Sequence, residues 1–185
     1  MTQPPSSSSS SPPGWSPTPA LRRALVLALF LLVAAVVGGR VDLAILAMPF
    51  VVGTATALRF RPQRQLEVGL STEQVHLVEG NDLALEIAVA NPDPSSYDLI
   101  LIRRDEAPWL ADQDGRRTLA TVVGGGQRSR ITVGGEIRRW GRHTYAPVRV
   151  DAVGADGLLV AAPVLSPPLA LKVFPRTDPF EADDA

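Results

Sequence analysis

The chain has 185 residues, no cysteine, and nearly balanced charge, with 18 Lys and Arg against 19 Asp and Glu. The absence of cysteine excludes a disulfide framework, a thiolate metal site, a cysteine nucleophile and a lipidated cysteine anchor. The charge is unevenly divided, because the first 65 residues hold 6 Arg and one Asp, whereas the rest of the chain holds 12 basic and 18 acidic side chains. This acidic second part gives no reason to expect nucleic acid as a partner.

Residues 1–20 are almost entirely Pro, Ser, Gly, Thr and Gln, with one aromatic side chain at Trp15. Such a segment buries too little apolar surface to offset its ordering entropy, so it is predicted to be a disordered Pro/Ser-rich tail. A ligand for a proline-recognition module is a second interpretation. Trp15 is expected near a membrane surface because of its residue type.

Residues 21–58 predict a transmembrane helical hairpin with spans at 21–39 and 41–58. Each run is just long enough to cross a bilayer core, which takes about 20 apolar residues as a helix. A pair of buried core helices is the alternative, but neither run has the polar stripe of a helix on a soluble surface. A single span would leave the other run in water. The second run and the lack of a small-x-small site before Arg40 argue against a cleaved signal peptide.

The orientation of the hairpin follows from the flanking positive charge, because Lys and Arg in short flanking segments are retained on the cytoplasmic side. The two predicted ends of the hairpin carry five arginines against Arg40 alone in the turn: Arg22, Arg23, Arg59, Arg61 and Arg64. We therefore expect a multi-pass protein of the plasma membrane with both ends in the cytoplasm. Residues 59–65 form the basic juxtamembrane linker in this interpretation.

Residues 66–176 change to the alternating pattern that indicates half-buried strands. Turn signals recur at short intervals, among them the predicted turn-rich loop Asn91-Pro92-Asp93-Pro94-Ser95-Ser96, and no segment shows a helical stripe. This pattern predicts an all-β immunoglobulin-like sandwich after the transmembrane hairpin. A small barrel is the alternative. The strands expected here are one or two within 68–78, then 83–90, 97–103, 117–123, 127–133, 145–152, 158–161 and 169–173. An acidic C-terminal tail follows at residues 177–185.

Two details of this region carry specific expectations. Gly124-Gly125-Gly126 lies between two predicted strands and indicates a β-hairpin turn. It lacks the Lys-Ser or Lys-Thr pair and the helix of a phosphate-binding P-loop. Pro147 interrupts the alternation of the strand at 145–152, which predicts an edge strand or a bulge.

The sequence contains no recognisable catalytic, cofactor-binding or metal-binding residues. His76 and His143 are the only histidines, and zinc needs three or four ligands at coherent spacing. Asp112 and Asp114 lack the ligand spacing of a calcium loop. No G-x-S-x-G elbow is present. We therefore predict a protein that is not an enzyme and needs no cofactor.

The cluster Arg138-Arg139-Trp140-Gly141-Arg142 mixes basic and aromatic side chains, as a nucleic-acid patch would. It is a single short cluster in an acidic region. The favoured interpretation is a turn that enters the strand of Tyr145, with no nucleic acid as partner.

The order of several short motifs resembles a known family. They are Glu79-Gly80-Asn81 before a strand ending in Asn91, then Arg139-Trp140-Gly141-Arg142-His143-Thr144-Tyr145, Pro147-Val148-Arg149-Val150, Asp156-Gly157-Leu158 and Val173-Phe174-Pro175-Arg176. After a membrane hairpin, this order over residues 21–180 is similar to the N-terminal half of the bacterial domain-of-unknown-function family fifty-eight. The Pro/Ser-rich start and the Arg- and Ala-rich composition resemble an actinobacterial member.

The resemblance implies a membrane-anchored β-sandwich that leads into a von Willebrand A-like domain. It also implies a MoxR-type AAA+ ATPase and transglutaminase-like membrane proteins as partners. The usual Asp-Pro-Phe-Gly-Leu-like turn is reduced here to Ala155-Asp156-Gly157-Leu158, and the von Willebrand A-like region does not follow Val173-Phe174-Pro175-Arg176 before Ala185. We therefore expect a shortened form of a longer protein, to which the activity of that region does not transfer.

The function expected from these observations is a non-enzymatic interaction or scaffold module, anchored in the lipid bilayer, that docks a MoxR-type ATPase system at the cytoplasmic face. The alternative is an outward-facing module that binds envelope polymer or mediates adhesion. The fold alone does not choose between them.

Overall fold

The computed structural model describes residues 14–59, 61–112 and 115–176. Its helices are α1 (Pro19–Gly38) and α2 (Val41–Arg59). The strands of the described residues are β1 (Trp15–Pro17), β2 (Glu67–Ser71), β3 (Leu77–Val78), β4 (Asp82–Ala90), β5 (Tyr97–Arg103), β6 (Leu110–Asp112), β7 (Thr118–Val123), β8 (Arg128–Ile137), β9 (Gly141–Tyr145), β10 (Arg149–Gly154), β11 (Leu159–Ala161), β12 (Val164–Leu165) and β13 (Leu169–Phe174).

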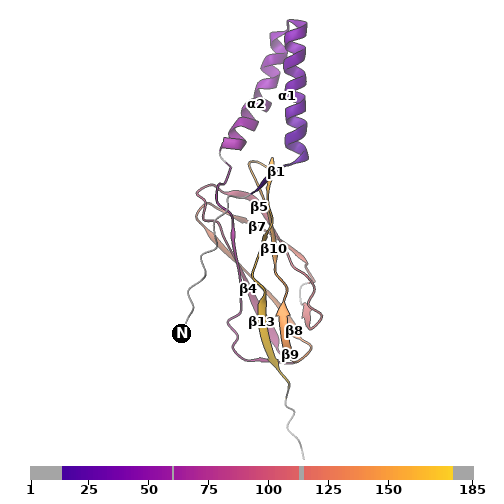
Figure 1. The fold of residues 1–185 in the computed structure, drawn as a ribbon, viewed down its shortest axis with the longest axis vertical. Coiled ribbons are helices and arrows are strands. Elements are labelled where there is room, and N and C mark those ends of the chain that lie inside the picture. Colours follow the sequence, from indigo (N-terminus) through magenta and orange to yellow (C-terminus); the bar gives the residue numbers. More distant parts are fainter. Residues whose placement is uncertain (1–13, 60, 113–114, 177–185) are drawn as a thin grey trace, which may run out of the picture.

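The two helices form an antiparallel pair that stands at one end of the β-rich part of the molecule (Figure 1). Gly39 adopts the left-handed conformation, with φ of 61°, that ends α1 and allows the reversal. Small side chains such as Ala28, Ala35 and Ala47 are buried between the helices, which permits close packing. Most of the remaining apolar side chains are exposed.

Both helices are candidate membrane spans by length and composition. Only 17% of the most apolar window of each helix is buried inside the protein. A core helix of a soluble protein would be mostly buried, so the predicted alternative of two core helices does not describe this pair. The observed bounds differ from the predicted spans, 21–39 and 41–58, by two residues or fewer at each end.

Three sheets make up the β-domain, by which we mean β2–β13 together with β1. The first sheet has the order β1-β11-β10-β5-β7, with β12 also paired to β10. The second has the order β2-β4-β8-β6, and the third β3-β13-β9. The prediction of a β-rich domain after two apolar helices is confirmed.

One hydrophobic core receives side chains from all three sheets. Alternate residues of β4 point inward, and Leu85 and Ile87 are 1% and 0% exposed. Ile100 of β5 and Leu171 of β13 belong to the same buried cluster. The apolar residues that alternate along the sequence therefore correspond to the inner faces of the sheets.

The expected hairpin at Gly124–Gly126 is wrong. β7 pairs with β5 in the first sheet, whereas β8 pairs with β4 and β6 in the second, so these glycines connect two sheets. The loop from Asn91 to Ser96 also connects two sheets, because β4 belongs to the second sheet and β5 to the first. The two connections bond to each other, because the Gly126 N–H donates to the Asp93 carbonyl at 2.8 Å.

The prediction of one edge or bulged strand at residues 145–152 is also wrong. Pro147 separates β9, at the edge of the third sheet, from β10, which lies between β5 and β11 in the first sheet. A proline lacks the N–H that a ladder needs, so it lies where the chain leaves one sheet for another. The short strands β1, β6 and β12 were not predicted from the sequence.

The predicted disorder of residues 1–20 is wrong for their described part. Trp15–Pro17 form β1 and Pro19 begins α1. Residues 1–13 and the predicted acidic tail at 177–185 lie outside the described residues.

Gly125 has no room for a side chain, because an added Cβ would overlap the carbonyl oxygen of Pro94 in the neighbouring connection. Gly125→Ala is therefore expected to lower the free energy of unfolding by roughly 2 kcal/mol. Gly69→Ala is the control, since its Cβ would meet only the Ala88 Cβ at 4.0 Å. Thermal unfolding of the full chain in detergent micelles measures both changes, and equal stabilities of the two variants would contradict the packing described.

Candidate functional site

The hairpin joins the β-domain through two short segments at the same end of the molecule (Figure 1). One is β1 with Thr18, which leads into α1. The other is the segment of Pro62 to Arg64, which follows α2. We call these two segments, together with Asn91, Asp93 and Tyr97 of the β-domain, the hairpin base.

The entry into α1 is held by a sheet ladder. β1 pairs antiparallel with β11, with Trp15 opposite Ala161 and Pro17 opposite Leu159. The Thr18 N–H and Oγ1 both donate to the Leu158 carbonyl at 3.0 Å. Thr18 Oγ1 also accepts the Leu21 N–H at 3.3 Å, which makes it the N-cap of α1. The first turn of the helix is thus fixed directly on the first sheet.

Trp15 ties the entry segment to the exit segment. Its ring stacks on Tyr97 with 6.0 Å between centroids, and its Nε1 donates to the Pro62 carbonyl at 3.2 Å. A Cβ on Gly154 would lie 3.2 Å from the Trp15 ring, so this glycine allows the close approach of the indole. Trp15 therefore packs on the β-domain, between β5, β10 and the chain that leaves α2.

The buried Asp93 side chain holds the exit segment. Its Oδ2 accepts the N–H groups of Gln63 at 2.7 Å and Arg64 at 2.9 Å. Its Oδ1 accepts the Ser95 N–H at 2.9 Å. Tyr97 adds a bond from its hydroxyl to the Arg64 carbonyl at 2.9 Å. The chain after α2 is thereby fixed to the β4–β5 connection.

Asn91 supports this carboxylate from behind. Its Oδ1 accepts the Asp93 N–H at 3.0 Å, and its Nδ2 donates to the carbonyls of Ser95 and Gly124. Asn91 is 1% exposed and Asp93 3% exposed. The two connections between sheets and the exit segment thus form one bonded unit.

The ionisation of the hairpin base follows from these contacts. Burial acts to raise the pKa of Asp93, but the hydrogen bonds from Ser95, Gln63 and Arg64 favour the carboxylate and leave the pKa below its usual value. Burial, with a smaller contribution from the Asp93 charge, raises the pKa of Tyr97 to about 12. Asp93 is therefore charged and Tyr97 neutral at neutral pH.

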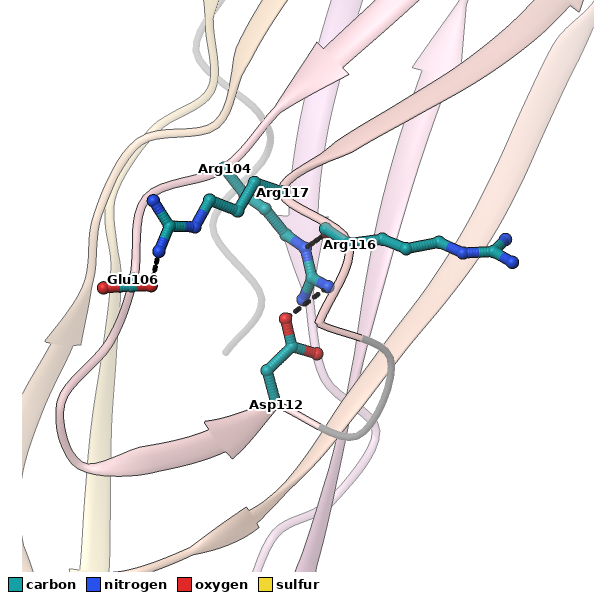
Figure 2. Close-up of polar contacts among 5 residues, drawn as sticks. All are labelled: Arg104, Glu106, Asp112, Arg116 and Arg117. Atoms are coloured by element: carbon teal, nitrogen blue, oxygen red, sulfur yellow. Dashed lines mark hydrogen bonds and ion pairs between the residues drawn. The ribbon is translucent and has the colours of Figure 1, made fainter.

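A second polar cluster lies where β5 and β6 end (Figure 2). The buried Arg104 guanidinium donates from Nε to the Arg116 carbonyl at 2.8 Å and lies 2.6 Å from Asp112 Oδ2 through Nη2. Arg117 pairs with Glu106 beside it. Since Arg104 follows β5 and Asp112 ends β6, the ion pair joins the first sheet to the second.

A pocket of about 360 Å³ lies at this cluster. Three arginines and three carboxylates line it, so its charge is balanced: Arg104, Arg117, Arg138, Asp105, Glu106 and Asp112. The lining residues include no Ser, Thr, Lys or His, and two of the three carboxylates, Asp112 and Glu106, are paired with Arg104 and Arg117. The arrangement supports a structural role for the cluster.

The residues considered in the sequence as metal ligands do not converge. The His143 ring stacks on Trp109 at 4.7 Å, whereas His76 lies beside Phe174 at 6.2 Å. Among the described residues, no group of three or more His, Asp or Glu could hold a metal ion. Asp112 bonds to Arg104, and Asp114 lies outside the described residues.

The hairpin base was not predicted as a unit. Asn91-Pro92-Asp93-Pro94 was interpreted only as a turn, and Trp15 as a residue of the tail that was expected near a membrane surface. The partners of Asp93 at Gln63 and Arg64 are about thirty residues away in the chain, and no local pattern connects them. The one signal was chemical, because Asn and Asp are turn residues that bond to backbone N–H groups.

Comparison with known proteins adds no functional assignment. No family model matches the chain, and no curated protein matches it. Among solved structures, a β-glucosidase from Listeria innocua in complex with glucose is 12% identical and has a TM-score of 0.26, over 58% of this chain and 17% of that chain. A similarity of this size carries no argument about fold or activity.

Asp93→Asn is expected to destabilise the protein, because an amide cannot accept all three N–H groups that the carboxylate accepts. Hydrogen bonds to a charged group contribute about 1.5–3 kcal/mol, so we expect a loss of about 2 kcal/mol at neutral pH. The lowered pKa means that this contribution is full above about pH 5 and decreases as the pH falls below about pH 4, through the folded-state pKa.

Thermal unfolding of the parent and of Asp93→Asn across this pH range measures the effect. The exposed Asp105→Asn is the matched control and should leave stability within about 0.5 kcal/mol of the parent. A difference between parent and Asp93→Asn that stays constant down to pH 2 would contradict the assignment to the carboxylate.

Proposed function

We propose that the hairpin crosses the plasma membrane twice and holds the β-domain at the cytoplasmic face. Arg22, Arg23 and Arg59 lie at the domain end of the helices, and Arg61 and Arg64 follow. At the opposite end, Arg40 pairs with Asp42 at 2.7 Å, so the turn carries no net charge. The asymmetry favours retention of the domain end on the cytoplasmic side.

The hairpin base is the observation that carries the proposal. Because β1 belongs to the first sheet and Asp93 holds the segment after α2, both ends of the hairpin are fixed to one folded domain. This favours two spans that return to the same side over a single span. It also presents the β-domain in one orientation to the membrane surface, as a docking module requires.

We infer that this domain is an immunoglobulin-like sandwich that acts as a non-enzymatic docking surface for a MoxR-type AAA+ ATPase. Support for the fold comes from the alternating inner faces of the sheets around one core. Support for the partner comes from the motif order that resembles the N-terminal half of the bacterial domain-of-unknown-function family fifty-eight.

The orientation can be tested with single cysteines, since the chain has none. Val75 in the β-domain is 87% exposed and Val41 at the hairpin turn is 72% exposed. A membrane-impermeant maleimide should label Val41→Cys in intact cells and Val75→Cys only after lysis. Labelling of Val75→Cys in intact cells would contradict the proposal and favour an outward-facing binding module.

The docking role predicts that the full chain in nanodiscs captures a MoxR-type ATPase of the same organism in a nucleotide-dependent manner. Capture should decrease for Asp93→Asn in proportion to its unfolded fraction, and Asp105→Asn should match the parent. If the immobilised chain retains no ATPase in any nucleotide state, the proposal of a MoxR-type ATPase as partner is contradicted.

A further inference from the structure

The third sheet lies at the end of the molecule away from the helices (Figure 1). Its strands β9 and β13 carry basic side chains. The strands β9 and β13 lie in two long stretches without any Asp or Glu, residues 137–150 and 157–177. We call the following exposed residues the distal basic face: Arg139, Trp140, Arg142, Lys172 and Phe174.

Two cations of this face lie directly beside each other. Arg142 of β9 is opposite Lys172 of β13 in the antiparallel register, and both side chains are exposed. Like charges directly opposite each other in a sheet are destabilising. This arrangement therefore costs stability in the isolated domain and is relieved when an anion lies over the pair.

The cations of the face have no acidic partner within the described residues. Arg139, Arg142 and Lys172 form no ion pair with a described carboxylate, whereas arginines elsewhere in the domain do. The nearest elements do carry carboxylates, at Glu79 after β3, Asp82 on β4 and Glu136 on β8. None of these three carboxylates, all within the described residues, forms an ion pair with Arg139, Arg142 or Lys172.

Aromatic side chains give the face an apolar component. Trp140 is 63% exposed at the turn into β9, and Phe174 is 39% exposed at the end of β13. The Lys172 ammonium lies 4.7 Å from the Phe174 ring centroid, and His143 Nε2 lies 2.9 Å from the Arg139 carbonyl. These contacts hold the Lys172 side chain and the backbone of the turn at Arg139. Trp and Arg are the residues most enriched at the centres of protein interfaces.

We propose that the distal basic face docks a carboxylate-rich segment of a partner protein, with Arg142 and Lys172 binding the carboxylates and Trp140 packing on the backbone beside them. This proposal specifies the surface used in the docking role proposed above, and it rests on that role. Headgroups of the membrane that holds the hairpin are a poor fit, because the face lies at the opposite end of the molecule (Figure 1). Single-stranded nucleic acid is bound on successive aromatic platforms along a groove. This face exposes two aromatic rings, and one of them, Phe174, already lies against the Lys172 ammonium.

The direct test uses the full chain in nanodiscs of phosphatidylcholine and a fluorescein-labelled peptide of four Glu-Glu-Ser repeats. Fluorescence anisotropy should show binding that weakens as salt rises, since exposed charges are screened beyond about 10 Å at 0.1 M. Arg142→Glu with Lys172→Glu should weaken binding at least about tenfold, and Trp140→Ala by a similar factor.

Arg116→Glu with Arg128→Glu is the matched control, because it changes the net charge equally at exposed positions outside the third sheet. This control should stay within about twofold of the parent. Equal loss in both double variants, or no binding by the parent, overturns the proposal. Tighter binding of a charge-matched oligothymidine at the same residues overturns it in favour of nucleic acid.

Two further measurements separate the other outcomes. If a variant that ends at Thr177 binds the probe much more tightly than the full chain, the acidic residues 178–184 occupy the face, which overturns an external partner. Capture of the ATPase by Arg142→Glu with Lys172→Glu at parental levels overturns this surface and leaves the proposed function intact. Probe binding through Arg142 and Lys172 without any ATPase capture supports the surface and removes the ATPase as its partner.

Discussion

The Asp93 carboxylate joins three parts of the chain that are far apart in sequence. It accepts the N–H groups of Gln63 and Arg64, which follow the hairpin, and that of Ser95 within its own loop. Burial of a charge without partners would be costly, and these three bonds offset that cost. Trp15 completes the connection from the other helix by stacking on Tyr97 and bonding to Pro62. The orientation of the β-domain relative to the hairpin depends on this small set of contacts.

The hairpin base lies between the two helices at one end of the molecule and the rest of the β-domain, which extends to the other end (Figure 1). At one end, apolar helices expose most of their side chains, as two membrane spans would. At the other end, the third sheet exposes cations without carboxylate partners among the described residues. Between them, Arg104 and Asp112 brace the first two sheets and the shared core fills the interior. A base that fixes both ends of the hairpin would hold the distal face at a set distance and direction from the bilayer, which is what the proposed docking role needs.

The sequence predicted the features that depend on local periodicity. The strand at 97–103 coincides with β5, because burial of one face of a sheet imposes a period of two. The apolar runs match α1 and α2 within two residues, because an unbroken apolar run of about 20 residues is itself the signal of a candidate membrane span. The sequence did not predict the features that depend on contacts between residues far apart in the chain. Gly124–Gly126 joins two sheets because Gly125 packs on Pro94, and no local pattern reveals that contact. The structural role of Trp15 was not predicted, because the residues around it are mostly Pro and Ser. Trp15 pairs with Ala161 in the sheet and stacks on Tyr97, both more than eighty positions away in the chain.

The central claim, that the hairpin and the β-domain form one rigid unit, is tested most directly by a distance measurement between them. Spin labels at Val41→Cys in the hairpin turn and Val75→Cys in the domain report this distance by pulsed electron paramagnetic resonance in nanodiscs. The account predicts one narrow distance distribution for the otherwise unchanged chain, which broadens when Trp15 is replaced by Ala. A broad distribution in the unchanged chain, unaffected by that replacement, would contradict it.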